Sequence, residues 1–222
     1  MRLGVLFSGG KDSAFAAYLT EKNNHEIACL ISIFSDNPSS YMFHTPSISK
    51  VEKQAERMEK PLIKETTSGE KEEELKDLRK VIKKAIKKSG IEGVVTGAVE
   101  SAYQASRVQR ICNDLDIECF NPIWQKKQVE LLEKLLEESF DVIITGVSAF
   151  PLDDKWLGRP IDRRFIRDVK TLEKKYGINP AGEGGEFETF VLNCPLYNRP
   201  LEIVDREKRG KQHSWSMEIE VK

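Results

Sequence analysis

Short apolar runs alternate with amphipathic segments along the first two thirds of the chain. The runs fall at residues 3–7, 27–34, 62–63, 93–97, 117–120 and 142–147. Between two of them, Leu75, Leu78 and Ile82 recur at the spacing of one helix face in a segment otherwise rich in Lys and Glu. Strands that alternate with helices pair in parallel and are buried on both faces. We therefore predict an α/β fold, a doubly wound parallel sheet that contains these runs.

The pattern changes after residue 147. Prolines, glycines and acids between Pro151 and Pro160 indicate a loop, and a helical stripe from Phe165 to Tyr176 ends at Gly177. Strand-like segments follow at residues 188–192, 201–204 and 214–221, the last two joined as a hairpin around residues 208–210. The sequence therefore predicts a first domain over residues 1–148 and a smaller C-terminal α+β domain over residues 149–222.

Composition limits the partners of such a protein. The chain has 222 residues, and its 35 Lys and Arg residues balance 36 Asp and Glu residues. This balance argues against a nucleic-acid partner, since a tRNA would need a local basic patch. The amino terminus enters an apolar strand directly, without the charged, apolar and small-residue sections of a signal peptide. We therefore expect a soluble cytoplasmic protein without a membrane partner.

The cysteines show no metal-binding or redox pattern. Cys29, Cys112, Cys119 and Cys194 are scattered without a CxxC pair. Cys29 and Cys112 lie in apolar stretches, where a free thiol packs as a small apolar group. We expect structural burial in preference to a metal or redox role.

A glycine-containing loop, Ser8-Gly9-Gly10-Lys11-Asp12-Ser13, follows the first apolar run and precedes a helical segment. Adjacent glycines let successive N–H groups converge on an anion, and the amino end of the helix adds its positive dipole. Lys11 adds a full charge, and Ser8 and Ser13 add hydroxyl donors. The common phosphate-loop string GxxxxGK is absent. The loop nevertheless predicts a phosphate site.

Asp12 is the unexpected residue in this loop, because a carboxylate beside phosphates is repulsive unless a cation lies between them. Mg²⁺ supplies such a bridge, so we assign Asp12 to Mg²⁺ and treat Lys11 and Asp12 as the catalytic pair. The simpler interpretation is a Gly-Gly turn with a polar helix cap. That interpretation leaves Lys11 and both serines unexplained.

The SGGKDS loop in this setting resembles the PP-loop, or N-type ATP pyrophosphatase, superfamily. The resemblance implies the adenine nucleotide alpha hydrolase-like fold, ATP cleavage between the α and β phosphates, a substrate adenylate and released pyrophosphate. It also implies that the nucleotide lies near Ile33 on the second strand and Gly97 after the fourth. ATP is the expected cofactor, together with Mg²⁺.

Five further sequence motifs narrow the resemblance to one family of that superfamily. They are Thr96-Gly97-Ala98, SAYQASR at 101–107, NPIW at 121–124, WLGR at 156–159 and GEGGEFET at 182–189. Together they resemble the diphthine–ammonia ligase family along nearly the whole chain, in an archaeal-type single-module form. The resemblance implies an ATP-dependent carboxylate–ammonia ligase, which converts the diphthine carboxylate of elongation factor 2 to the amide with free ammonia. Residues 1–148 would then bind ATP and residues 149–222 the substrate.

The acidic turn before a predicted strand is the main substrate candidate. Diphthine carries a quaternary ammonium group, which a carboxylate can balance. The residues proposed from this turn are Glu183, Gly184, Gly185, Glu186, Glu188 and Thr189. A hydrated acidic surface turn is the alternative.

Two other segments supply substrate candidates. Tyr103, Gln104 and Arg107 lie about one helical turn apart, and Arg107 suits an adenylate phosphate. A surface ion pair is the alternative for Arg107. His44 lies in a polar loop and is either a substrate contact or an incidental loop residue.

Two rival functions stay open at this point. A tRNA-modifying PP-loop enzyme would share the loop, and a non-catalytic ATP-binding sensor would share the fold. A homo-oligomer also stays open.

Overall fold

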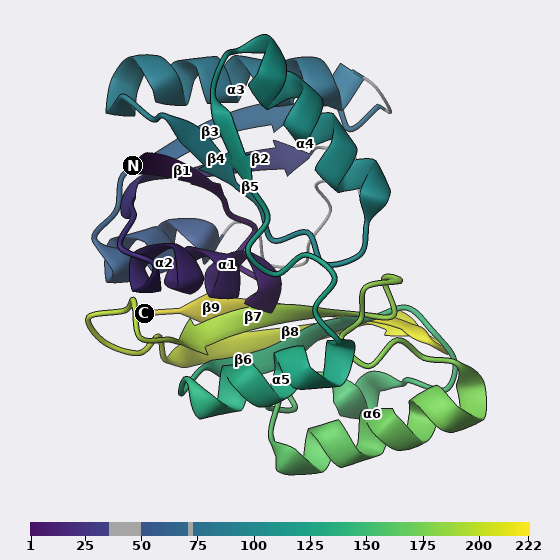
Figure 1. Ribbon diagram of the computed structural model, residues 1–222. Coiled ribbons are helices and arrows are strands. Elements are labelled where there is room, and N and C mark those ends of the chain that lie inside the picture. The colour runs from purple at the N-terminus through teal and green to yellow at the C-terminus, as the bar shows by residue number, and fades with distance from the viewer. Residues whose placement is uncertain (36–49, 71–72) are drawn as a thin grey trace.

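The computed structural model describes residues 1–35, 50–70 and 73–222, and it contains a parallel sheet of five strands in the order β3-β2-β1-β4-β5 (Figure 1). The strands are β1 (Arg2–Leu6), β2 (Glu26–Ser35), β3 (Leu62–Thr67), β4 (Gly93–Val95) and β5 (Glu118–Phe120). The strand order reverses between β1 and β4. Doubly wound folds bind ligands at the carboxyl ends of the strands beside such a switch point.

Helices cover both faces of this sheet. In Figure 1, α3 (Glu73–Ser89) and α4 (Ala102–Asp114) lie on one face, and α1 (Lys11–Lys22) and α2 (Val51–Met58) lie on the other. Leu78 and Ile82 of α3 are fully buried in a core cluster with Ile31 and Val94 of the sheet. This burial confirms the amphipathic helix that the spacing in the Lys- and Glu-rich segment predicts.

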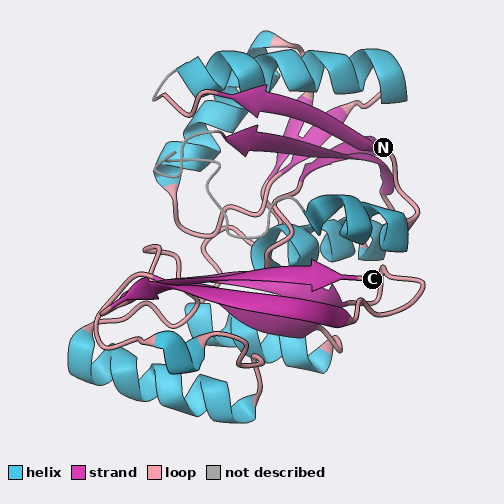
Figure 2. Cartoon of the chain, turned by 180° about the vertical axis from the view of Figure 1, so that it is seen from behind, coloured by secondary structure: helices cyan, strands magenta, loops and turns pink. Residues whose placement is uncertain are grey.

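A four-stranded antiparallel sheet forms a second layer, in the order β7-β6-β9-β8. Its strands are β6 (Asp141–Val147), β7 (Phe187–Asn193), β8 (Ile203–Lys211) and β9 (Ser214–Val221). α1 and α2 lie between the two sheets in both ribbon views (Figure 1, Figure 2). One core cluster accordingly runs from Val5 through Phe15 of α1 to Phe190 of β7.

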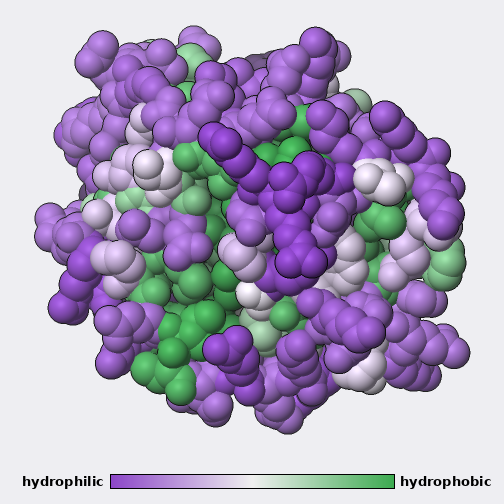
Figure 3. Space-filling view, turned by 90° about the horizontal axis from the view of Figure 1, so that it is seen from below, coloured by the Kyte–Doolittle hydropathy of each residue, from purple (hydrophilic) through white to green (hydrophobic). Residues whose placement is uncertain are grey.

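The outer face of the second sheet is covered by α5 (Gln128–Glu137) and α6 (Arg163–Tyr176), and a short 3₁₀ helix, η2 (Asp154–Trp156), precedes α6. α6 ends where the sequence predicts, at Gly177, whose φ of 70° caps the helix in the left-handed region. Viewed from the side of these helices, the surface is largely polar with apolar side chains exposed between the polar ones (Figure 3).

The expectation that residues 142–147 join the parallel sheet is wrong, because β6 pairs antiparallel with β7 and β9. Six of its seven residues are buried. The inner helices cover one face of β6 and the outer helices cover the other. A strand buried on both faces reads as a continuous apolar run in either kind of sheet, so periodicity alone could not distinguish the two.

We propose that the division between the two units lies at residues 121–127, between β5 and α5, and not at residues 148–149. The hairpin turn between β8 and β9 lies later in the chain than the sequence predicts. β8 extends to Lys211, and the connection to β9 lies at Gln212 and His213 instead of residues 208–210. In the part of the chain that the structure describes, no helix combines the length and apolar character needed to cross a membrane.

Candidate nucleotide and substrate site

The predicted phosphate loop joins the carboxyl end of β1 to the amino end of α1. Gly9 has a φ of +83°, a conformation that L side chains rarely adopt. The Ser13 hydroxyl donates to the Gly10 carbonyl at 3.1 Å and accepts from the Ser8 N–H at 3.2 Å. Gly10 is the N-cap residue of α1, and no side chain hydrogen-bonds to the helix from that position. The amino end of α1 therefore has the form of an anion-binding site.

Lys11 and Asp12 form a partly buried ion pair beside this loop. The Lys11 side chain is 4% exposed, and its Nζ lies 2.7 Å from Asp12 Oδ2. Asp12 Oδ1 is buried without a hydrogen-bond partner in the described structure. Mg²⁺ commonly binds through one or two carboxylates and the phosphate oxygens of the substrate, so this free carboxylate oxygen fits a Mg²⁺ ligand. Among the described residues no group of three or more His, Cys, Asp or Glu forms a metal site.

The second sheet holds the loop from the other side. Thr189 Oγ1 accepts from the Lys11 N–H at 3.1 Å, and the Val191 N–H donates to the Gly9 carbonyl at 3.1 Å. Gln54 of α2 donates to the carbonyls of Gly9 and Val191, each at 2.9 Å. β7 therefore contacts the predicted phosphate loop directly. Gln54 is not among the site residues predicted from the sequence. Thr189, which was predicted to contact substrate, contacts the loop backbone, and its contact with substrate stays a prediction.

Gly97 allows α1 to approach the loop after β4. A Cβ at position 97 would lie 2.7 Å from the backbone N of Ser13 and 2.8 Å from the carbonyl carbon of Asp12. Only glycine fits between these backbone atoms without moving α1. Ile33 is buried in β2 opposite Glu65 of β3. Contacts of Ile33 and Gly97 with a nucleotide remain predictions.

The acidic turn lies between α6 and β7, and Glu183 connects it to the rest of the site. Glu183 Oε2 accepts from the Glu100 N–H at 3.3 Å. Burial, followed by repulsion from Asp12, raises the pKa of Glu183 to about 7, whereas Lys11 acts to lower it. The predicted substrate turn and the predicted phosphate loop are therefore neighbours in the fold.

Glu186 and Glu188 have different surroundings in the same turn. Glu186 Oε1 accepts from the Asn179 N–H at 2.9 Å, and a Cβ at Gly184 would lie 2.8 Å from that oxygen. Glu186 therefore holds the turn in shape. Glu188 Oε2 is buried without a partner in the described structure, and burial raises the pKa of Glu188 to about 8. Gly185 has a φ of +82° with open space around it.

The predicted residues on α4 form local contacts. The Gln104 N–H donates to the capping hydroxyl of Ser101 at 3.3 Å, and the Arg107 guanidinium lies 3.4 Å from the Tyr103 ring centre. The Glu100–Glu183 hydrogen bond brings the amino end of α4 to the acidic turn. Substrate contacts of Tyr103, Gln104 and Arg107 remain predictions. His44 lies outside the described residues.

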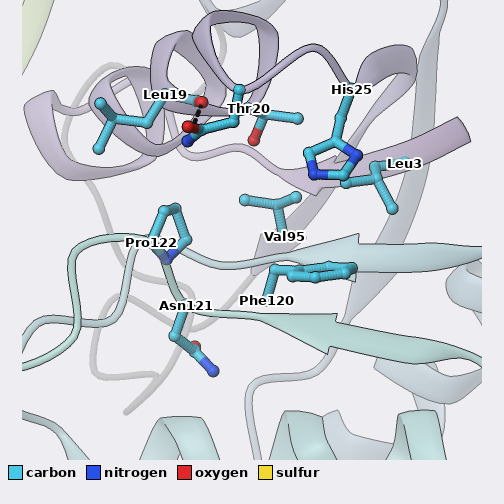
Figure 4. Close-up of a pocket in the computed structure, with 9 residues that line it drawn as sticks. Leu3, Leu19, Thr20, His25, Val95, Phe120, Asn121 and Pro122 are labelled. Carbon is cyan, nitrogen blue, oxygen red and sulfur yellow. Dashed lines mark hydrogen bonds between the residues drawn. The ribbon is translucent and has the colours of Figure 1, made fainter. Parts of the chain in front are cut away.

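A separate cavity of about 230 Å³ lies between α1 and the strands β4 and β5 (Figure 4). Leu3, Leu19 and Val95 supply apolar walls, and the His25 ring lies 5.7 Å from the Phe120 ring. None of the predicted site residues lines this cavity.

Two cysteines that are seven positions apart meet in the fold. A hydrogen bond between the Cys112 and Cys119 thiols raises the pKa of Cys112 and lowers that of Cys119. All four cysteines are free, and three of them are buried, including Cys29 and Cys112 as predicted. The sequence spacing gave no sign of this contact.

The fold and the site together define a doubly wound α/β protein in which the loops after β1 and β4 meet at the switch point of the sheet. The family model described as "Diphthamide synthase N-terminal domain" matches residues 1–119, and the "Diphthamide synthase C-terminal domain" model matches residues 127–221. The chain belongs to the diphthamide synthase family.

Curated relatives agree with this assignment. The chain is 35% identical over 224 residues to the diphthine–ammonia ligase of Bos taurus, covering 92% of this chain and 83% of the relative. It is 34% identical to the human diphthine–ammonia ligase, with the same coverage of each chain. A solved structure described as a predicted subunit of tRNA methyltransferase from Methanocaldococcus jannaschii is 20% identical, with a TM-score of 0.45 over 88% of this chain and 98% of that one.

Proposed function

We propose that this protein is an ATP-dependent ligase that amidates the diphthine carboxylate of elongation factor 2 with free ammonia. The observation that carries the proposal is the meeting of the two motif regions, since Thr189 of the GEGGEFET motif accepts a hydrogen bond from the Lys11 N–H of the phosphate loop at 3.1 Å. A nucleotide held at the loop would then lie next to a substrate held at the turn. The family membership supports the same reaction.

The loop residues would bind ATP through its phosphates. Ser8, Gly9, Gly10 and Ser13 supply N–H and hydroxyl groups, and the amino end of α1 favours negative charge. Lys11 would offset the charge that develops on the α phosphate. Asp12 would hold Mg²⁺ through its free carboxylate oxygen, and the metal would screen the phosphate charges.

The reaction takes place in two steps. In the first, an oxygen of the substrate carboxylate attacks the α phosphorus of ATP, the bond between the α phosphorus and the bridging oxygen breaks, and pyrophosphate leaves. In the second, ammonia attacks the carbonyl carbon of the acyl-adenylate, AMP leaves with the carboxylate oxygen, and the nitrogen releases a proton. No protein nucleophile is needed, so the chain chiefly positions the reactants and balances their charge.

The buried carboxylates suit the cationic part of diphthine. A pKa of about 8 keeps Glu188 mostly protonated at neutral pH, and a pKa of about 7 leaves Glu183 about half protonated there. A quaternary ammonium group beside them would favour the ionised forms. Glu183 and Glu186 each accept one backbone N–H bond, and Oε2 of both Glu186 and Glu188 is buried without a partner in the described structure, so all three carboxylates are candidates to balance the cation.

The family membership disfavours tRNA modification and a non-catalytic sensor. We place the reaction in the cytoplasm, where elongation factor 2 acts.

Glu188→Gln and Glu183→Gln, singly and together, should weaken binding of the diphthine-bearing factor and leave ATP affinity within a few-fold of the wild type. Unchanged affinity for the factor in all three variants would show that these carboxylates do not balance the quaternary ammonium group of diphthine.

Deletion of the gene followed by mass spectrometry of elongation factor 2 tests the function in the cell. We expect the modified histidine to retain its carboxylate, and re-expression of the wild-type protein to restore the amide. A fully amidated factor in the deletion strain would contradict the proposal.

A further inference from the structure

Gln54 lies where three distant segments of the chain meet. It is in the middle of α2 and is fully buried, with 0% exposure. Its Nε2 donates to the Gly9 carbonyl of the phosphate loop and to the Val191 carbonyl of β7, both at 2.9 Å. One amide nitrogen has two hydrogens, so both are used in this way.

These bonds fix the direction of one carbonyl in the loop. The Gly9 carbonyl accepts from Gln54 and also from the Val191 N–H at 3.1 Å. A carbonyl that pointed at a phosphate would repel it, whereas a nest of N–H groups attracts it. With two donors on its oxygen, the Gly9 carbonyl is held toward α2 and β7.

Gln54 also fills the space beside Gly9. A Cβ built on Gly9 would lie 2.3 Å from Gln54 Oε1 and 3.2 Å from Val51 Cγ2. The glycine in the loop and the glutamine in α2 are therefore fitted to each other. On the β7 side, the Tyr197 hydroxyl donates to the Val191 carbonyl at 3.4 Å, which gives that oxygen a second donor.

We propose that Gln54 is a positioning residue for nucleotide phosphates: it holds the Gly9 carbonyl away from them and ties the loop to β7, the strand that follows the acidic turn. This inference rests on the proposed binding of ATP at the loop. It predicts that removing the amide weakens the binding of phosphates and spares the binding of the nucleoside.

Isothermal titration of ATP with Mg²⁺, and of adenosine, tests this in the full-length protein. Gln54→Met keeps the length of the side chain and removes both donors, and Gln54→Asn keeps the amide but shortens its reach. Leu78→Ala is the control, because Leu78 is fully buried in α3 on the opposite face of the parallel sheet. It lowers stability without touching the loop.

We expect the Kd for ATP to rise about tenfold in Gln54→Met, which is the loss expected for one or two buried hydrogen bonds, with the Kd for adenosine unchanged. Gln54→Asn should show the same selectivity, and it carries the test if Gln54→Met does not fold. Leu78→Ala should lower the melting temperature and keep both affinities.

Equal losses for ATP and adenosine in the Gln54 variants, or no loss for either, would overturn the role of Gln54. The affinities of the wild-type protein for ATP and adenosine test separately whether the loop binds phosphates. A wild type that binds adenosine as tightly as ATP would contradict the proposed phosphate site, whatever the variants do.

Discussion

Replacement of Gly97 by alanine tests how closely α1 must approach the loop after β4. The new Cβ would lie 2.7 Å from Ser13 N, about 0.7 Å inside the 3.4 Å at which ordinary contact begins. Both close atoms, Ser13 N and Asp12 C, belong to the backbone, so no side-chain rotation relieves the overlap. Either the loop after β4 or the first turn of α1, which carries Lys11 and Asp12, must move, and both changes alter how the two segments fit together.

The expected cost has two parts. Overpacking of this kind destabilises a fold by about 1–3 kcal/mol, which for a chain of this size lowers the melting temperature by roughly 2–4 °C per kcal/mol. Misplacement of reacting groups by a comparable distance can cost about 100-fold in rate. We therefore expect Gly97→Ala to lower kcat/KM for ATP by about 10-fold to 100-fold.

The assay pairs thermal unfolding with steady-state pyrophosphate release, and Gly90→Ala is the matched control. Gly90 has a φ of +60° with nothing within 4 Å of an added Cβ. Alanine there is strained by about 1–2 kcal/mol through the backbone alone, far from the loop. Similar losses of stability in Gly97→Ala and Gly90→Ala, with the wild-type kcat/KM kept in both, would contradict the need for a close approach between α1 and the loop after β4.

Three further predictions concern the side chains of Asp12, Thr189 and Glu188. Asp12→Asn should reduce Mg²⁺-dependent turnover by about 100-fold or more, since the carboxylate that holds the metal is lost; a wild-type rate at saturating Mg²⁺ would exclude the metal role. Thr189→Val removes the acceptor for the Lys11 N–H and should weaken ATP binding several-fold, by about 1 kcal/mol, as measured by titration; an unchanged Kd would show that this bond does not shape the loop. Burial raises the pKa of Glu188 from 4.5 to about 8, so its contribution to stability is complete below the unfolded value and is lost as pH rises toward 8. The melting temperature of Glu188→Gln should therefore fall less between pH 5 and 9 than that of the wild type or of the exposed control Glu133→Gln, and parallel curves would contradict the buried carboxyl.

Local sequence patterns were sufficient to predict much of the fold. The loop from Ser8 to Ser13, the helical stripes of α3 and α6 and the glycine cap at Gly177 depend on neighbours within a few residues, and the structure has all of them. β6 could not be assigned in the same way. Its pairing depends on β7 and β9, 40 or more residues later in the chain, and not on its own apolar run.

Local sequence patterns also predict only part of the site. The acidic turn could be singled out because glycines and carboxylates adjoin in the sequence, but its contact with the phosphate loop depends on how β7 packs against α1. Gln54 looks like an ordinary polar residue on a charged helix. Its role becomes visible only when α2, the loop and β7 are brought together. The Cys112–Cys119 contact was missed for the same reason.

The most direct test of the central claim is product analysis in a reconstituted reaction. The purified protein is mixed with ATP, Mg²⁺, ammonium and elongation factor 2 that carries the diphthine carboxylate, and nucleotides and the factor are analysed together. We predict AMP, pyrophosphate and newly amidated factor in equal amounts, and neither AMP nor pyrophosphate when the carboxylated factor is replaced by the already amidated one. Formation of ADP, or of AMP without amide, would contradict the account.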